Sequence, residues 1–408
     1  MARYRRHRCS FALRGAQTAA KLPAIIGPSV FHKAGMMKRR QLLLGAAASA
    51  WTLPSLVACG AAEDEQAIAL VLRRPLDVHN GDSNQLAREL VRFATLAPSS
   101  HNTQCWRFKI HHKQINITPD LFRRCPAVDP DDHHLFVSLG CATENLALAA
   151  LANGLQAEAQ FSDAGDGMIE LDLVATKAIV SPRYQAIATR QCTRADYDGR
   201  PLAINELRLL EQAGSGDGVR VQLLTAPPMI ESVLEYVVAA NTAQMNDPRF
   251  VAELKEWIRF GSDEALRAGD GLFVATTGNP AMPRWLGSRF MNFFFTPKSE
   301  NERDARQIRN AAGIAVFISA RNDKRHWIEA GRCYERFALQ ATALGIRNAF
   351  LNQPVEVGSI RPQFAAWLGL NSNRAEGEDA TRPDLVVRFG RGTAMPMSMR
   401  RPVEAVLI

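Results

Sequence analysis

The pattern of hydrophobic and polar positions predicts two long helices of the same character. Between 129 and 155, leucines and alanines recur at helical spacing and Gly154 fits a C-terminal stop, and residues 326–346 repeat this pattern. An offset of 191 residues aligns six identities in fifteen positions without a gap: Gly140 with Gly331, Glu144 with Glu335, Ala147 with Ala338, Leu148 with Leu339, Ala150 with Ala341 and Gly154 with Gly345. The small residues on one face suit close helix–helix contact. The sequence therefore predicts an internal duplication with two buried helices.

A dense polar turn separates a helix-like apolar segment at 86–96 from a strand-like alternation at 107–110. The turn, 97–106, contains Ser99, Ser100, Asn102 and Gln104 around a proline. Backbone N–H groups and hydroxyl or amide dipoles at the end of a helix suit an anionic or heteroaromatic ligand. The alternative is a polar turn that its own side chains cap.

Basic residues at two other places form a second group of candidates. Residues 187–197 contain Arg190, Cys192 and Arg194, and the strand-like 385–387 is followed by Arg388 and Arg391. Arginine is well shaped for bidentate phosphate contact. The alternatives are a solvated basic turn and a solvated strand end. Amide side chains follow the second repeat helix at Asn352 and Gln353.

The chain begins with a basic leader. Residues 1–58 contain ten Lys or Arg and no acidic residue, which leaves 39 basic against 41 acidic residues, a net charge of about −2. The basic balance of the whole chain is therefore no argument for nucleic-acid binding. Arg39-Arg40 before a short apolar run resembles a twin-arginine export signal, and 56–59 resembles a lipobox with Cys59 as the acylated residue. The alternatives are a membrane anchor, which the short run disfavours, or an accidental match. We expect an exported protein, periplasmic or tethered to a membrane through Cys59.

The segment at about 250–303 lacks repeat character and is rich in Trp and Phe. An exposed Phe-rich patch is an aggregation liability, so we expect this insertion to be buried, either as a lid over a ligand or as packing between two modules. The chain contains no nucleophile elbow, P-loop, zincin or dinucleotide-binding motif.

Histidine and cysteine usage gives no metal centre. Adjacent side chains point in different directions on a strand or a helix, so we do not expect a metal ion shared within either adjacent pair, His111-His112 or His133-His134, and both pairs are expected at the surface. The five cysteines after Cys59 form no C-x-x-C pair. They are expected to be buried thiols with at most one incidental bridge.

The polar turn, with Trp106, resembles the A-P-S-x-x-N-x-Q-P-W turn of nitroreductase-like FMN oxidoreductases, although Cys105 stands where that family usually has proline. Residues 187–202 resemble the R-R-S-x-R-x-F…R-P-V start of a subunit in that family, and the region from 86 to 407 resembles Acg-type proteins, in which two such modules are fused. The resemblance implies an α+β, nitroreductase-like fold with two mixed sheets flanked by helices. It implies modules at 65–180 and 181–408, the second with the insertion at about 250–303, forming an intrachain pseudo-dimer.

The resemblance also implies one FMN site between the modules, because a second P-S-x-x-N turn is missing. The implied flavin contacts are Ser99, Ser100, Asn102 and Gln104 from the first module, and Arg190, Cys192, Arg194, Asn352, Gln353, Arg388 and Arg391 from the second. No side chain needs to act as a nucleophile. The expected activity is hydride transfer through flavin N5 from a small-molecule donor to a nitro- or quinone-like acceptor. The alternatives are a flavin-storing protein without turnover and an exported dehydrogenase with an unknown acceptor.

Overall fold

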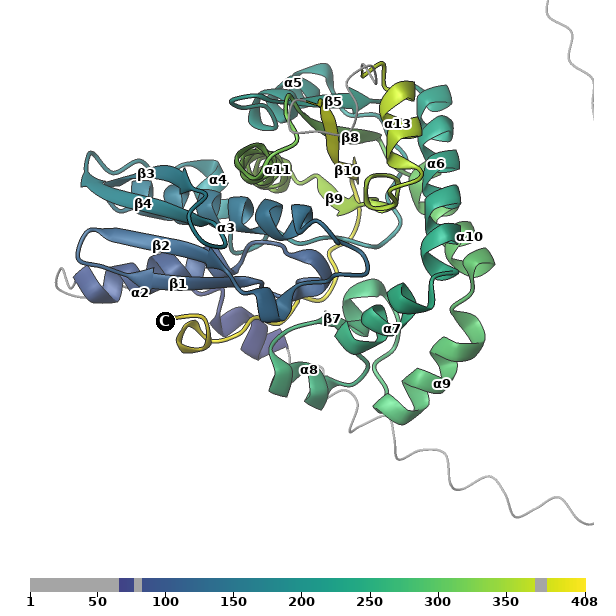
Figure 1. The fold of residues 1–408 in the computed structure, drawn as a ribbon, viewed down its shortest axis with the longest axis horizontal. Helices are drawn as coiled ribbons and strands as arrows, with labels where there is room; N and C mark the ends of the chain where they lie inside the picture. The colour runs from purple at the N-terminus through teal and green to yellow at the C-terminus, as the bar shows by residue number, and fades with distance from the viewer. Residues whose placement is uncertain (1–65, 77–82, 371–379) are drawn as a thin grey trace, which may run out of the picture. The chain divides into compact units, whose positions relative to one another are not determined.

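Two four-stranded sheets form the framework of this computed structural model, which describes residues 66–76, 83–370 and 380–408 (Figure 1). In spatial order, the first sheet consists of β1 (Trp106–Ile110), β2 (Gln114–Pro119), β4 (Met168–Ala175) and β3 (Leu155–Ser162). The second consists of β5 (Val219–Leu224), β8 (Gly313–Ser319), β10 (Arg382–Gly390) and β9 (Arg347–Phe350). The predicted α+β class is confirmed. The leader and Cys59 lie outside the described residues.

The prediction that both sheets are mixed is wrong for the strand pairings within them. Every strand pairing within the two four-stranded sheets is antiparallel. Parallel pairing occurs at their edges as isolated bridges, between Cys192 and Asn348 and between Phe108 and Leu407. The first bridge joins the segment after the first sheet to β9 of the second sheet. The other brings the end of the chain back to β1.

The two repeat helices lie between the sheets and pack on each other. They are α3 (His133–Ala152) and α11 (Lys324–Ala343). Both end before a glycine with positive φ, 78° at Gly154 and 70° at Gly345, as the sequence predicts. α3 is long and apolar enough to cross a membrane, but 83% of its most apolar window is buried inside this fold. It is therefore a core helix here.

The remaining helices cover the sheets and form the insertion. Near the first sheet are a helical stretch at 66–71, α2 (Ser83–Thr95), η1 (Ser100–Asn102), η2 (Leu121–Arg123), α4 (Pro182–Ala186) and η4 (Val403–Ala405). The later chain adds α5 (Ile204–Ala213), α6 (Pro227–Met245), α10 (Pro297–Arg309), α12 (Gln353–Glu356) and α13 (Arg361–Trp367). The insertion contains α7 (Pro248–Trp257), β6 (Ile258–Arg259), α8 (Ser262–Ala268), β7 (Leu272–Phe273), η3 (Val274–Thr277) and α9 (Arg284–Phe294).

One large apolar core joins the two sheets through α3 and α11. Phe108 from the first sheet, Leu139 and Phe337 from the two helices, and Phe389 from the second sheet belong to the same buried cluster. The insertion builds a separate cluster around Phe250. This arrangement fixes the turn after α2, the second sheet and the insertion around a common space.

Candidate functional site

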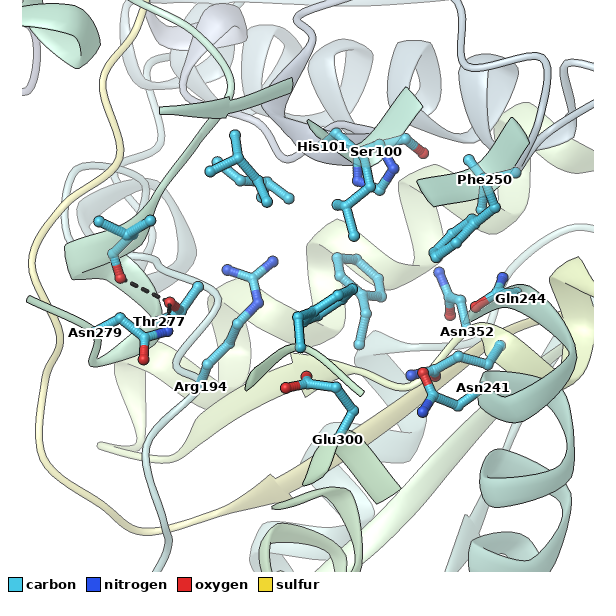
Figure 2. Close-up of a pocket in the computed structure, with 18 of the residues that line it drawn as sticks. Ser100, His101, Arg194, Asn241, Gln244, Phe250, Thr277, Asn279, Glu300 and Asn352 are labelled. Atoms are coloured by element: carbon cyan, nitrogen blue, oxygen red, sulfur yellow. Dashed lines mark hydrogen bonds between the residues drawn. The ribbon is translucent and has the colours of Figure 1, made fainter. Parts of the chain in front are cut away.

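A cavity of about 900 Å³ lies between the turn after α2, the insertion and the ends of β9 and β10 (Figure 2). Its volume falls within the roughly 300–1,000 Å³ of small-molecule and cofactor sites. It brings together five of the predicted contact residues, Ser99, Ser100, Arg194, Asn352 and Gln353. They come from segments far apart in sequence, so the fold itself assembles this part of the predicted site.

The turn at 98–104 has an unusual backbone. His101, Asn102 and Gln104 have φ values of 48°, 54° and 54°, in the left-handed region that non-glycine residues rarely adopt. The Ser99 hydroxyl oxygen accepts a hydrogen bond from the main-chain N–H of Gln104 at 2.9 Å and closes the turn. Such backbone conformations cost about 1–3 kcal/mol each and persist where the surroundings hold them. The turn presents Ser99, Ser100 and His101 to the cavity.

Asn102 and Gln104 do not line the cavity, although both were predicted as ligand contacts. The Asn102 side-chain amide donates to the carbonyl of Gly271 at 3.0 Å, and that of Gln104 donates to Gly269 at 2.8 Å. The Gln104 oxygen accepts from the main-chain N–H of Arg401 at 2.8 Å. These amides tie the turn to the insertion and hold its shape.

His101 is a cavity residue that the sequence did not single out. Its Nε2 atom is buried without a hydrogen-bond partner in the described part of the chain. Burial, and then the charges of Arg194 and His134, lower the pKa of His101 to about 4. The imidazole is therefore neutral at pH 7 and keeps one nitrogen lone pair available.

Arg194 is a cation of the cavity wall that has no counterion among the residues the structure describes. Its main-chain carbonyl accepts from the Gln307 amide at 2.7 Å, which fixes the backbone. Across residues 66–76, 83–370 and 380–408, its guanidinium makes no hydrogen bond or ion pair, and Figure 2 shows it projecting into the cavity. A free guanidinium in a concave site is ready to bind an anionic or electron-rich group.

Asn352 and Gln353 lie where β9 leads into α12, as predicted for the loop after the second repeat helix. The Asn352 side-chain oxygen accepts from the main-chain N–H of Val386 at 3.0 Å, which leaves its NH₂ group for the cavity. Gln353 donates to Asp304 at 3.4 Å, while its Oε1 atom is buried without a partner among the described residues. Both amides can therefore contact a ligand.

The structure places Arg190 and Cys192 outside the cavity lining. Arg190 is 3% exposed, donates to the Leu96 carbonyl at 2.8 Å and lies 3.1 Å from Glu335. Burial raises the pKa of Glu335 to about 7, and the charge of Arg190 opposes that shift. Cys192 pairs with Asn348 at the edge of the second sheet. Both residues join the two halves of the described chain.

Arg388 and Arg391 are also occupied by protein partners. Arg388 is 1% exposed, lies 4.2 Å from the ring centre of Tyr197 and donates to Gln307 at 2.9 Å. Arg391 forms an ion pair with Glu206 at 2.7 Å. The alternative of a solvated strand end is wrong for Arg388. Neither residue lines the cavity.

Several polar residues of the cavity carried no recognisable signal in the sequence. Asn241 and Gln244 lie three residues apart on α6, so they share one helix face, and Glu300 belongs to α10 (Figure 2). Thr277 and Asn279 come from the insertion. Helical spacing could have paired the two amides, but only the fold shows which space they face.

The insertion lines much of the cavity with apolar side chains, including Phe250 and Phe260. This position agrees with the lid interpretation, and the buried cluster around Phe250 agrees with packing as well.

The expectation that the Phe-rich part of the insertion is buried is wrong. Trp285, Phe293 and Phe294 on α9 are 67%, 74% and 66% exposed. α9 contributes Met291 to the insertion's core and turns these three side chains outward.

The two histidine pairs differ from each other. His111 and His112 are exposed, as predicted. His133 and His134 are 0% and 4% exposed, so the surface prediction is wrong for this pair. They begin α3, whose first turn is covered by β10 and α12. The five cysteines of the described residues are all free.

No family model matches this chain. Two Mycobacterium tuberculosis proteins, each provisionally named as an NAD(P)H nitroreductase, are similar to it. One is 24% identical over 300 residues, covering 71% of this chain and 83% of the relative. The other, Acg, is 22% identical over 344 residues, covering 79% of this chain and 96% of the relative. The resemblance to nitroreductase-like proteins is thus supported by relatives that span most of the chain.

Solved structures of nitroreductases also align with it. A Bacteroides fragilis nitroreductase with bound FMN covers 52% of this chain and is itself covered to 89%, with 14% identity and a TM-score of 0.32. An Anabaena variabilis protein, provisionally described as a nitroreductase, covers 80% of this chain and is covered to 91%, with 11% identity and a TM-score of 0.43.

Proposed function

We propose that this protein is an FMN-dependent oxidoreductase of the nitroreductase type, with one flavin in the cavity described above. The observation that carries the proposal is the guanidinium of Arg194, which has no partner in the described part of the chain and faces the hydroxyl-rich turn at 98–101 across a cavity of about 900 Å³. The provisional names of the M. tuberculosis relatives support the same reaction class.

The residues present fit a flavin. Next to the unpaired Arg194, the described lining contains buried polar atoms without partners, His101 Nε2 and Gln353 Oε1. Ser99 and Ser100 offer hydroxyls from the turn. A heteroaromatic ring with both donors and acceptors on its edge satisfies such a mixed set, whereas a purely apolar ligand leaves it unsatisfied.

The chain's own residues would bind, orient and tune the cofactor. Arg194 would lie at the pyrimidine edge, where a cation favours the anionic reduced form and raises the potential. Asn352 and Gln353 would face the other edge of the ring. FMN, when bound, supplies hydride transfer at N5. The phosphate contacts inferred for Arg190, Arg388 and Arg391 are replaced here by protein partners, so binding depends mainly on Arg194 and the turn.

The arrangement as a fused pseudo-dimer belongs to the same proposal. α3 and α11 occupy equivalent central places between the two sheets, and the turn residues precede α3 whereas Arg194 follows it. We expect a single site of this kind per chain. Export by the leader, with lipidation of Cys59, remains part of the proposal and concerns residues outside the described ranges.

The donor in this proposal is NAD(P)H and the acceptor a small nitro- or quinone-like compound. A second candidate is a flavin-storing protein without turnover. It is favoured by the insertion, whose side chains wall much of the cavity and would restrict entry of a nicotinamide ring.

The test begins with the flavin content of purified protein, by absorbance and by the mass of the released cofactor. Arg194→Ala should lower FMN affinity by at least about tenfold, the effect of one charge-assisted contact. Arg200→Ala is the matched control, because the Arg200 side chain is 85% exposed and lies outside the cavity. Equal FMN affinity in Arg194→Ala and Arg200→Ala would overturn the assignment of the flavin site to this cavity. If NAD(P)H bleaches the bound flavin and a nitroaromatic is reduced over repeated turnovers, the oxidoreductase function is supported. If flavin is bound but NAD(P)H does not bleach it, the flavin-storing function is supported.

A further inference from the structure

His133 and His134 form a buried histidine pair that the flavin proposal leaves without a role. Their ring centres lie 4.6 Å apart at the start of α3. The His133 ring packs edge-on against Trp327, with 5.2 Å between ring centres. Two adjacent imidazoles rarely share one buried space, because each brings polar nitrogens that need partners.

Hydrogen bonds fix the orientation of both rings. His133 Nε2 lies 2.8 Å from the Asp384 carboxylate, and His134 Nε2 lies 3.3 Å from the Asp384 main-chain carbonyl. Since both acceptors take a hydrogen bond from Nε2–H, each Nδ1 carries a lone pair. Neither Nδ1 has a hydrogen-bond partner among the described residues. Metal-binding histidines are held in this way, with the second nitrogen bonded to a carboxylate or a carbonyl.

Two carboxylates lie near the free lone pair of His134. His134 Nδ1 lies 3.9 Å from Asp129 Oδ1 and 3.8 Å from Glu356 Oε1, too far for hydrogen bonds. Ligand atoms of Asp129, His133 and His134 all lie within 4.8 Å of one another. Two ligands bound to one ion at about 2.1 Å lie roughly 3–4 Å apart, so the spacing suits a shared cation after small adjustments.

The supporting contacts hold the carboxylates in place. Asp129 accepts the main-chain N–H groups of His134 and Leu135 at 3.0 and 2.9 Å. Glu356 accepts from the Gln244 amide at 2.7 Å. Each carboxylate still has lone pairs left for a metal ion.

The nearby positive charge does not exclude a cation. Two arginines lie near the pair. Arg382 approaches Asp384 at 3.9 Å, but it forms an ion pair with Asp131 at 2.8 Å. Arg361 donates to the main-chain carbonyl of Val355 at 3.2 Å. Access is available too, since His134 and Glu356 both line the cavity.

We propose that His133, His134, Asp129 and Glu356 bind one divalent transition-metal ion that favours imidazole and carboxylate ligands, of the Zn²⁺ or Fe²⁺ type. The site lies in the wall of the large cavity, beside the place proposed for the flavin. It does not depend on the flavin, because none of its ligands belongs to the predicted flavin contacts.

The experiment measures metal and flavin separately in the same purified full chain. Protein stripped with a chelator is dialysed against Zn²⁺, and bound metal is counted by mass spectrometry. Co²⁺ serves as a second probe, since imidazole ligation gives visible absorption bands. We expect one tightly bound ion per chain and Co²⁺ bands that Zn²⁺ removes. The flavin is read from its own absorbance, so loss of one proposal leaves the other measurable.

The variants His134→Gln and Glu356→Gln should each weaken Co²⁺ binding by at least about tenfold. The double variant His111→Gln with His112→Gln is the control, because it removes the exposed adjacent pair. Circular dichroism and melting establish that each variant is folded, and Glu356→Gln keeps the test valid if His134→Gln does not fold. Absent metal binding in the wild type, or equal binding in folded Glu356→Gln, would overturn the proposal. Loss of binding in the control would also overturn it, since the ion would then sit at the surface pair.

Discussion

Gly140 of α3 and Gly331 of α11 contact each other's helices reciprocally. A Cβ atom added at Gly140 would lie 2.0 Å from the main-chain oxygen of Ile328, and one added at Gly331 would lie 2.0 Å from that of Val137. Both the two glycines and the two carbonyl residues are separated by 191 positions, the offset of the internal repeat. The close crossing therefore follows a local two-fold relation, and glycine is required because no side chain fits.

The first prediction concerns this crossing. Gly331→Ala places a methyl group against the backbone of α3, which cannot move away without separating the helices. We expect a loss of at least about 1–3 kcal/mol in the free energy of unfolding, as for overpacked cores. Gly358→Ala is the control, because nothing lies within 4 Å of its added Cβ. Denaturant unfolding of both variants checks this, and equal stability would show that the helices separate easily.

The elements could be read from the sequence because their signals are local. Apolar spacing and end glycines predicted both repeat helices, and the polar run predicted the turn. The roles of arginines could not be read in the same way. Arg190 meets Glu335 and Arg388 meets Gln307, and both pairings depend on how distant segments come together. Asn102 and Gln104 likewise support the turn through insertion carbonyls.

The sequence also does not predict what a given helix face contacts in the folded chain. The spacing on α6 places Asn241 and Gln244 on one face, but the sequence does not say that this face borders a cavity. His133 and His134 were expected at the surface because adjacent side chains point in different directions and no shared ligand was expected for them. β10 and α12 cover these two side chains. Both elements are more than 200 residues further along the chain, so the sequence around position 133 does not predict this burial.

The second prediction concerns the anchor of the insertion. Asp270 is buried between Arg123 and Arg259, with 2.6 Å to Arg259, and so joins the insertion to the segment after β2. Asp270→Asn leaves two cations partly unpaired. Hydrogen exchange across 258–295 should therefore accelerate, with little change in the sheets.

Asp263→Asn is the control for that anchor, because Asp263 is exposed on α8. If the insertion limits entry to the cavity, NAD(P)H should also bleach the proposed bound flavin faster in Asp270→Asn than in the control. Unchanged exchange in Asp270→Asn would mean that the apolar cluster alone holds the insertion.

The third prediction concerns the outer side of α9. Trp285 and Phe293 are exposed and do not line the cavity. Replacing both with Ser should leave the free energy of unfolding within about 0.5 kcal/mol and reduce self-association at high concentration. Phe250→Ser is the contrast, since Phe250 is buried in the insertion's core and its loss should cost about 3–5 kcal/mol. Light scattering and denaturant unfolding measure the two effects, and a large stability loss in the double variant would show that α9 packs on this side.

The last prediction concerns acid stability. Burial lowers the pKa of His101 to about 4 in the folded chain, while the unfolded imidazole titrates near its ordinary value of 6.5. Between these values the unfolded state binds more protons than the folded state, so stability present above pH 6.5 is lost as the pH falls toward about 4. His101→Gln removes this group, so its free energy of unfolding should fall less steeply across that window, by at most about 1.4 kcal/mol per pH unit. His112→Gln, at an exposed position outside the cavity, is the matched control. Denaturant unfolding across the window measures all three slopes, and parallel curves for His101→Gln and the wild type would mean that His101 takes up its proton in the folded cavity as readily as in water.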